Sequence, residues 1–395
     1  MQDLLKDYAA NENNPKWEQI IKRKEPLYTR NPDLRNPFER DYTRVIHSDA
    51  YRRMKHKTQV FFSPSDDHIC TRIEHVTHVE SISSTIAKYF GLNADLTKAI
   101  ATAHDIGHSA FGHQGEKILS ELSKRDLGEA FWHERNGMEV MDKIELLEDP
   151  NGNKQNMNLT YAVLDGIISH CGEIDENHLK PRDEAIDLYD YKYPNEYAPY
   201  TWEGCVVKIA DKIAYLGRDI ADAITLGILD ENIEELHKIL NHDSSKPLNN
   251  TVLINEIVFD LCENSNLEKG LCFSKEMFRK INEIKKFNYK NIYFSDKLQM
   301  TNKYFEVILT TIYDVLKTSY SDREKAYKIC PKLIEEFEDW MKNYREEGRH
   351  RYNRNEVVFD FTKEKDYLKG MIYYISGMTD NYAIEMYNRI IKFGY

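Results

Sequence analysis

The chain has 395 residues, a formal net charge of −12 and a charged fraction of 30%. Its apolar fraction of 41% is ordinary for a globular protein, and its length suffices for one large domain or two. The acidic balance argues against general affinity for nucleic acid. No apolar run reaches the roughly 18 residues that cross a bilayer, and no signal-peptide pattern opens the chain, so we expect a cytoplasmic protein.

The cysteines and the basic residues narrow the kinds of site that the chain can carry. The six cysteines are scattered without a CxxC pair, which argues against a disulfide framework and against a cysteine zinc site. Residues 52–57 (RRMKHK) are strongly basic within an acidic protein. This stretch is compatible with a pocket for a small polyanion, and equally with a solvated charged face.

Apolar residues recur at three- and four-residue steps, which predicts helices throughout. A helix is expected over 75–90, ending at Gly91, and a second one begins after Asn93 and ends before Gly107. A third helix is predicted over 203–227. Further helical segments are expected at about 252–285, 296–320, 331–347 and 379–393.

Two stretches are predicted to be irregular. Residues 148–158 are polar and rich in turn formers, and residues 172–202 are rich in proline and tyrosine. Long connections of this kind in compact domains are often functional. A short hairpin near 350–362 is left open, because apolar residues alternate there only briefly. A polar stretch near 230–250 is the best candidate for a boundary.

Seven of the fourteen histidines lie between positions 68 and 133. The densest part contains His104 and Asp105 at the end of a predicted apolar helix, where burying them is costly unless they are paired or bind a cation. Gly107 and Gly112 allow the backbone to turn sharply nearby. Imidazole and carboxylate ligands suit Mn, Fe, Co, Zn or Mg, so the pattern does not select one metal. Any one of these histidines alone is better interpreted as a hydrogen-bonded core residue.

A second polar set lies on the helix predicted over 203–227. Asp211, Tyr215 and Asp219 are spaced i, i+4 and i+8, which places them on one stripe of the helix. By spacing alone, a solvated helix face explains the stripe slightly better than a binding site does. The stripe indicates a binding site only if polar residues from other helices lie beside it.

Taken in order, the motifs resemble the HD superfamily of phosphohydrolases, and specifically its deoxynucleoside triphosphate triphosphohydrolase (dGTPase-like) branch. The resemblance covers roughly residues 28–230 and implies an all-α HD-domain bundle, followed by a mostly helical C-terminal region. The matching residues and segments are Arg40-Asp41, Arg44, His47-Ser48, Arg52-Arg53, 57–61 (KTQVF), 71–75 (TRIEH), 104–108 (HDIGH), 111–113 (FGH), Glu116, His133-Glu134, Glu203-Gly204, Val207 and 210–215 (ADKIAY).

The resemblance implies that His75, His104, Asp105 and Asp211 bind one divalent metal ion per subunit. It also implies the reaction, which is hydrolysis of a dNTP at the α-phosphorus to a deoxynucleoside and inorganic triphosphate. Four protein ligands on a six-coordinate ion would leave two positions for water and a phosphate oxygen.

Six residues would bind the substrate according to the same resemblance. They are Arg72, Lys212 and Tyr215 on the triphosphate, Gln59 and Asp219 on the deoxyribose 3′-hydroxyl, and Val60 beneath the sugar. A tight fit at the sugar would reject a 2′-hydroxyl.

His113 is the expected acid or base near the scissile bond, because an imidazole titrates near neutral pH. Which of the two roles it takes is left open. Glu116 would orient it at i+3, and His108 and His133 would extend the proton relay. A structural role for His133 stays open, and His170 is interpreted equally well as a site residue or as a helix-terminal histidine.

Two departures from the family pattern leave base preference and regulation open. Tyr42-Thr43 and Ser109-Ala110 stand where relatives commonly carry other pairs. The alternatives are an HD phosphohydrolase acting on another nucleotide and a non-catalytic dNTP sensor. No ligand is missing, and His113 is present, which disfavours the sensor.

The resemblance also implies the organisation of the molecule. We expect an N-terminal extension at 1–35, an HD phosphohydrolase core at 36–235, and a helical region at 236–395 that closes the site and forms subunit contacts. A homo-oligomer, either a tetramer or a hexamer, and activation by a second dNTP are expected by the same resemblance.

Overall fold

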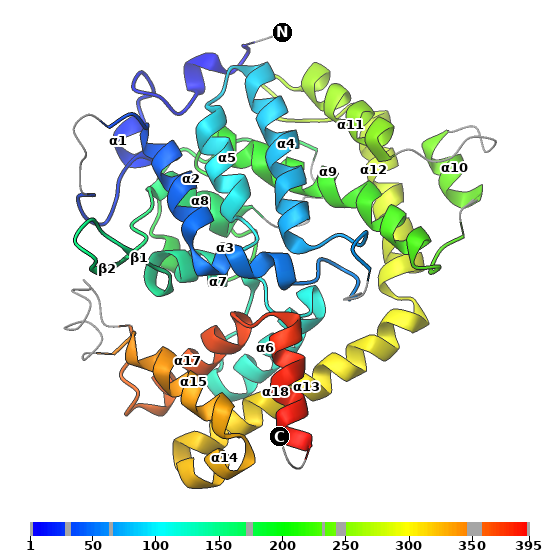
Figure 1. Ribbon diagram of the computed structural model, residues 1–395. Coiled ribbons are helices and arrows are strands. Elements are labelled where there is room, and N and C mark those ends of the chain that lie inside the picture. Colours follow the sequence, from blue (N-terminus) through cyan, green and yellow to red (C-terminus); the bar gives the residue numbers. More distant parts are fainter. Residues whose placement is uncertain are drawn as a thin grey trace.

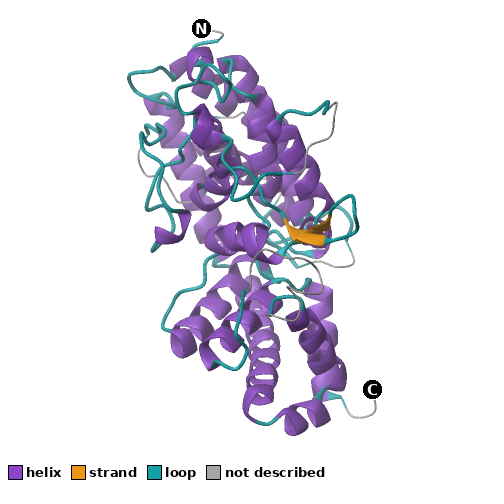
Figure 2. Cartoon of the chain, turned by 90° about the vertical axis from the view of Figure 1, so that its left-hand side faces the viewer, coloured by secondary structure: helices purple, strands orange, loops and turns teal. Residues whose placement is uncertain are grey.

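The protein is mostly helical in the computed structural model, which describes residues 3–27, 33–62, 66–170, 177–230, 234–241, 250–345 and 358–392 (Figure 2). This confirms the predicted all-α class. In those ranges the strands are β1 (Leu146–Glu148) and β2 (Lys154–Asn156), which form one antiparallel pair. None of the helices described is both long enough and apolar enough to cross a membrane.

The helices fall into an N-terminal and a C-terminal series (Figure 1). The first series comprises α1 (Trp17–Ile20), α2 (Pro37–His47), α3 (Asp49–Arg53), α4 (Arg72–Phe90), α5 (Ala94–Ala103), α6 (Gly112–Leu127), α7 (His133–Glu139), α8 (Tyr161–Ser169) and α9 (Trp202–Thr225). The second comprises α10 (Glu234–Leu240), α11 (Asn250–Asn264), α12 (Lys275–Asn288), α13 (Asp296–Ser321), α14 (Arg323–Ile329), α15 (Pro331–Lys342), α17 (Glu364–Ser376) and α18 (Asp380–Ile391). Short helical turns are η1 (Lys6–Tyr8), η2 (Met54–His56), η3 (Val140–Ile144), η4 (Leu188–Asp190) and η5 (Tyr289–Tyr293).

Of the two helices that lead to the dense histidine segment, α5 begins after Asn93 as predicted, whereas α4 ends as predicted but begins at Arg72 rather than at 75, because Thr71 and Glu74 form a capping box there. α4 ends at Gly91, whose φ of 73° lies in the left-handed region that glycine adopts at little cost. The Asn93 side chain accepts hydrogen bonds from the main-chain N–H groups of Asp95 and Leu96, and so caps α5. The third predicted helix is α9, with 24 residues.

Two other predicted segments differ in detail from the structure, and two more lie largely outside the described ranges. The helical stretch at 252–285 is two helices, α11 and α12, because the chain turns at Gly270, where φ is 85° and Leu271 pairs with Leu179. The 148–158 stretch is not wholly irregular, since β2 lies within it and pairs with β1. Residues 350–357 of the possible hairpin lie outside the described ranges, as does most of the 230–250 boundary, so the predicted domain limits stay a prediction.

Two hydrophobic cores organise the described helices. The first lies among α2, α4, α5, α8, α9, α11 and α12, with α4 packed against α5 and α9. The second lies among α6, α13, α14, α15, α17 and α18, which form the lower part of the molecule in Figure 1. α6 follows the histidine-rich segment directly, yet its Ile118, Leu119 and Leu122 belong to the second core. The cores therefore meet beside the histidines.

Gly166 of α8 lets that helix approach α5 closely, and its replacement tests this packing. A Cβ atom at position 166 would lie 2.6–2.7 Å from three side-chain atoms of Ile100. Gly166→Ala should therefore lower the free energy of unfolding by about 1–3 kcal/mol, as overpacked core substitutions do, although Gly-to-Ala normally favours a helix. Chemical denaturation measures the change.

The control is Gly166→Ala in an Ile100→Ala background, where the clashing atoms are gone. The additional alanine should then cost little or should stabilise, and a double-mutant cycle should give a clear coupling energy. An equal loss of stability in both backgrounds would contradict the packing argument.

Candidate active site

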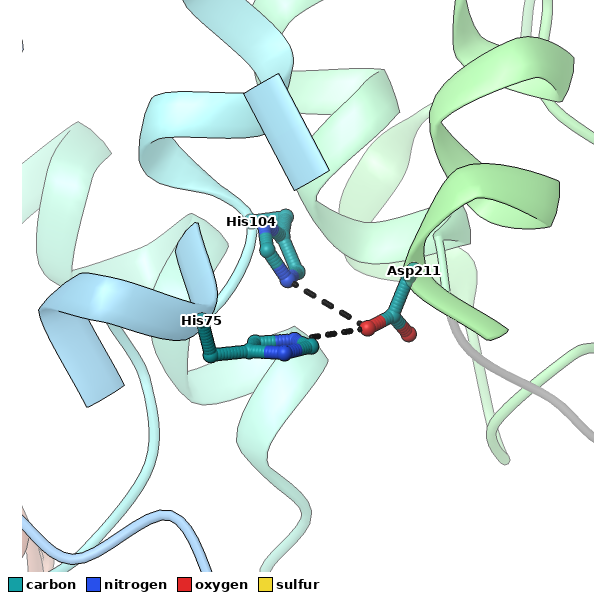
Figure 3. A group of neighbouring side chains, drawn as sticks. All are labelled: His75, His104 and Asp211. Carbon is teal, nitrogen blue, oxygen red and sulfur yellow. Dashed lines mark hydrogen bonds and ion pairs between the residues drawn. The ribbon is translucent and has the colours of Figure 1, made fainter. Parts of the chain in front are cut away.

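Four predicted ligands converge from three separate elements. His75 lies on α4, His104 and Asp105 directly follow α5, and Asp211 lies on α9; Figure 3 shows His75 and His104 directed at Asp211. The Nε2 atom of His75 is 2.9 Å from Oδ1 of Asp211, and that of His104 is 3.7 Å from the same oxygen. Asp105 lies 3.6 Å from His104 and 3.8 Å from His75. The packing of α4 against α5 and α9 produces this convergence.

The donor set fits a metal ion. Nδ1–H of His104 donates to the carbonyl of Ala101 at 2.7 Å, which leaves the lone pair of Nε2 directed at the carboxylates. This buried Nε2 has no hydrogen-bond partner among the described residues, an arrangement that is costly unless a cation completes it. His170 repeats the pattern, with Nδ1 2.6 Å from the carbonyl of Ile167 and Nε2 4.0 Å from Asp105. The structure thus brings His170 to the cluster.

Asp105 is held by an arginine that is completely buried. Nη1 of Arg72 donates to Oδ2 of Asp105 at 2.6 Å, while its Nη2 donates to the main-chain carbonyls of Thr58 and Gln59. Burial alone would raise the pKa of Asp105, but the Arg72 guanidinium and His104 outweigh it and hold this pKa well below its usual range. Asp105 is therefore a carboxylate at neutral pH, as a metal ligand must be.

A chain of imidazoles and carboxylates leads from this cluster to the surface. Glu116 of α6 accepts the main-chain N–H of His133 at 2.9 Å and lies 3.0 Å from Nδ1 of the same ring. Burial opposes ionisation of Glu116, but His133 and His113 lower its pKa well below the usual value. Nδ1 of His113 is 3.6 Å from Glu116, and the His113 side chain is 68% exposed. An exposed imidazole backed by a partly buried carboxylate can exchange protons with a bound molecule.

His108 connects this chain to the ligand cluster. Its ring stacks on that of His133, with centroids 3.7 Å apart, and its Nε2 lies 3.1 Å from Oδ1 of Asp105. Burial and the nearby Arg72 charge lower the pKa of His108 well below its usual value, so this imidazole is neutral near pH 7. The four predicted catalytic residues therefore form one continuous set, although the roles assigned to them stay predictions.

Comparison with known proteins identifies the family. Residues 72–216 match the HD domain, and residues 271–389 match the phosphohydrolase-associated domain. The chain is 33% identical to a deoxyguanosinetriphosphate triphosphohydrolase-like protein of Caldanaerobacter subterraneus, over 91% of this chain and 86% of the relative. It is 31% identical to a Rickettsia bellii protein described in the same words, over 95% and 97% of the two chains.

The chain belongs to the deoxyguanosinetriphosphate triphosphohydrolase-like family of HD phosphohydrolases. All four clustered residues, His75, His104, Asp105 and Asp211, lie within the HD match. The associated domain covers α12 to α17 and nearly all of α18, and thus much of the second hydrophobic core. A buried set of histidines and aspartates is consistent with the divalent metal site of an HD domain.

The residues predicted to bind the sugar lie on two separate segments of this HD phosphohydrolase: Gln59 and Val60 precede α4, and Asp219 lies on α9. Gln59 is buried, and its side-chain oxygen has no hydrogen-bond partner in the part of the chain described; Val60 beside it is half-buried. Asp219 is buried on α9 and accepts a 2.5 Å hydrogen bond from the hydroxyl of Tyr293. Burial raises the pKa of Asp219 to about 6. The Gln59 oxygen and the Asp219 carboxylate can therefore accept further hydrogen bonds.

The residues predicted to bind the triphosphate do not share one surrounding. Arg72 contacts Asp105, as above. Lys212 and Tyr215 line an apolar crevice between α9 and α12, together with Ile209 and Phe278. Because these three residues do not line one common site, their contacts with the triphosphate stay a prediction.

Three residues that contact the site were not predicted from the sequence. Lys57 and Asp380 bond to the main chain of the histidine segment, and Tyr293 bonds to Asp219. Lys57 lies within both the basic stretch and the KTQVF motif, so the sequence already pointed to it as a candidate site residue. Asp380 and Tyr293 come from the C-terminal half, where no motif marks them.

Asp219 generates a prediction about pH. Its pKa is raised from 3.8 to about 6 in the folded protein, so the native state loses stability as the pH rises from about 4 to 6 and regains none above that. Asp219→Asn removes this ionisation and can still accept from Tyr293. The variant should therefore be more stable than the parent by about 1–3 kcal/mol at pH 8, with a difference near zero at pH 4.

Urea denaturation at both pH values measures the difference. Asp314→Asn on α13, where the carboxylate is 60% exposed, is the control and should show no comparable dependence on pH. A gain of equal size at pH 4 and pH 8 would show that ionisation of Asp219 is not its cause.

Proposed function

We propose that the protein hydrolyses a deoxynucleoside triphosphate to a deoxynucleoside and inorganic triphosphate, with dGTP as the preferred substrate. The convergence of His75, His104, Asp105 and Asp211 at 2.9–3.8 Å carries the proposal. Relatives described as deoxyguanosinetriphosphate triphosphohydrolase-like support the substrate class and the base.

These four side chains would hold one divalent ion, of Mn, Mg, Fe, Co or Zn. A bound divalent ion supplies Lewis-acid polarisation of a phosphate oxygen and lowers the pKa of its water. The protein supplies the orientation: Ala101 fixes the tautomer of His104, and Arg72 keeps Asp105 ionised. The geometry accommodates His170 as a further imidazole beside Asp105.

His113 would either donate a proton to the leaving 5′ oxygen or accept one from the attacking water. Its exposed ring can reach a bound nucleotide, and Glu116, 3.6 Å from its Nδ1, can orient the ring. His133 bonds Glu116 through its main-chain N–H and lies beside it with its ring, and His108 stacks on His133 and reaches Asp105.

The remaining predicted residues would orient the nucleotide. Lys212, Tyr215 and Arg72 are proposed for the triphosphate, since cationic and phenolic donors suit phosphate oxygens. Gln59 and Asp219 would bind the 3′-hydroxyl, and the unsatisfied oxygen of Gln59 supports a donor at that place. Val60 would pack beneath the sugar, where an added 2′-hydroxyl would meet an apolar wall.

We further propose that the protein is cytoplasmic, assembles as a tetramer or hexamer, and is activated by a second dNTP. Exposed apolar side chains support assembly: Phe294 is 64% and Met300 is 69% exposed. The C-terminal region would then both form subunit contacts and close the site.

Product analysis tests the proposed reaction. The purified protein is incubated with each dNTP and Mn²⁺ or Mg²⁺, and the products are separated by ion-exchange chromatography. Free deoxynucleoside and inorganic triphosphate should appear in equal amounts, fastest from dGTP. Monophosphate with pyrophosphate would instead identify a different phosphohydrolase reaction, and binding without any product would identify a sensor.

Asp211→Asn tests the metal site with almost no change of shape. An amide is a weak ligand for a divalent ion, so metal content by elemental analysis and dNTP turnover should both fall to background. The matched control is Asp222→Asn on the same helix, where the carboxylate accepts the main-chain N–H of Cys70. The control should retain the metal. Full metal content in Asp211→Asn would exclude Asp211 as a ligand.

A further inference from the structure

The connection between α17 and α18 reaches the active-site segments through one buried carboxylate. Asp380, the first residue of α18, is only 4% exposed. Its Oδ2 accepts the main-chain N–H of Thr58 at 2.8 Å, and its Oδ1 accepts that of Phe111 at 2.8 Å. A single side chain of the associated domain therefore holds two loops of the HD core.

Both bonded positions stand next to residues that the proposed reaction uses. Thr58 immediately precedes Gln59, which is proposed at the sugar. Phe111 precedes the start of α6, two residues before His113. Phe111 has a φ of 62°, which is unfavourable for a residue with a bulky side chain and persists only when its surroundings hold it. Its N–H bond to Asp380 is one such constraint.

The two loops also lie directly against each other. A Cβ atom on Gly112 would be 2.9 Å from the carbonyl oxygen of Gln59, so the backbones touch there and leave no room for a side chain. Nη2 of Arg72 donates to the carbonyls of Thr58 and Gln59, and Nη1 of the same side chain holds Asp105. Thr58, Gln59 and the proposed metal ligand Asp105 are therefore all bonded to one guanidinium.

Two side chains, those of Lys57 and Asn136, bridge the same connection to the histidine segment. Nζ of Lys57, which is buried, donates to the carbonyl of His108 at 2.5 Å and to that of Ser376 at 2.8 Å. Nδ2 of Asn136 donates to the carbonyl of Gly107 at 2.7 Å and to the hydroxyl of Ser376 at 3.2 Å. The end of α17 and the start of α18 thus contact the segment at three points.

We propose that Asp380 is a positioning residue for the hydrolysis. It keeps the Gln59 loop and the start of α6 in the one relative position that directs Gln59 and His113 at the same bound nucleotide. The proposal rests on the proposed function. It gives the associated domain a direct part in the HD reaction, beyond covering the site.

A carboxylate suits this position because both of its oxygens accept hydrogen bonds. Asparagine offers one accepting oxygen, and its amino group would face one of the two N–H donors. Asp380→Asn therefore keeps the volume of the side chain and loses one of the two bonds. Asp380→Ala loses both, and leaves two buried N–H groups unsatisfied.

The experiment compares Asp380→Asn and Asp380→Ala with the parent protein on the dNTP that it hydrolyses fastest. Misplacement of reacting groups by about 1 Å can cost about 100-fold in rate, so kcat should fall by about that factor in Asp380→Ala and by less in Asp380→Asn. Metal content should stay that of the parent, because all four ligands remain. KM should change much less than kcat.

The matched control is Glu203→Ala at the start of α9. The buried Glu203 likewise accepts two main-chain N–H groups, those of Ala10 at 2.8 Å and Asn93 at 2.9 Å, but contacts neither active-site loop through them. It should lose comparable thermal stability and keep the parent kcat. Hydrogen exchange should quicken at Thr58 and Phe111 in the Asp380 variants, and at Ala10 and Asn93 in the control.

The outcomes separate the two proposals. A parent protein that hydrolyses no dNTP overturns the proposed function, and the positioning role falls with it. A parent that hydrolyses dNTPs, beside Asp380 variants of unchanged kcat, overturns the positioning role alone. An equal fall of kcat in Glu203→Ala would also overturn it, since general destabilisation would then account for the loss.

Discussion

The ion pair between Arg72 and Asp105 is the constraint on which the rest of the site depends. Both side chains are almost completely buried, so each would be strongly destabilising without the other. Arg72 begins α4 and Asp105 follows α5, so the pair joins the two helices at the ligand cluster. Nη2 of Arg72 donates to the carbonyls of Thr58 and Gln59. The same guanidinium therefore maintains a negative ligand and places the loop proposed for the sugar.

The arrangement of the two cores explains why an HD site is built together with a C-terminal helical region. α6 begins at the site but packs its apolar face among α13 and α17. His113 and Glu116 lie on the first turns of that helix, so their position depends on the second core. The proposed ligands His75, His104 and Asp211 depend on the first. The residues proposed to handle the proton and those proposed to bind the metal are thus carried by different cores, which meet beside Asp105 and His108.

Much of this site could be predicted because its residues break local rules. His104 and Asp105 at the end of an apolar helix are anomalous in the sequence itself, and the helices around them have plain apolar periodicity and caps. Tyr293 and Asp380 break no such rule: each is an ordinary residue at a helix end or turn. Their contacts span 74 and 269 or more positions, and no local pattern encodes a pairing over that distance. His170 was ambiguous for the same reason.

The sequence by itself determined the helical class, the end of α4 and the start of α5, and it marked the residues proposed as metal ligands, because periodicity, capping and buried polarity are local properties. Only the tertiary structure decided which groups satisfy one another. It assigned Arg72 to Asp105, stacked His108 on His133, and set Asp380 between two loops. The physical reason is that a buried polar atom must find a partner wherever the packing of the helices brings one within hydrogen-bond distance.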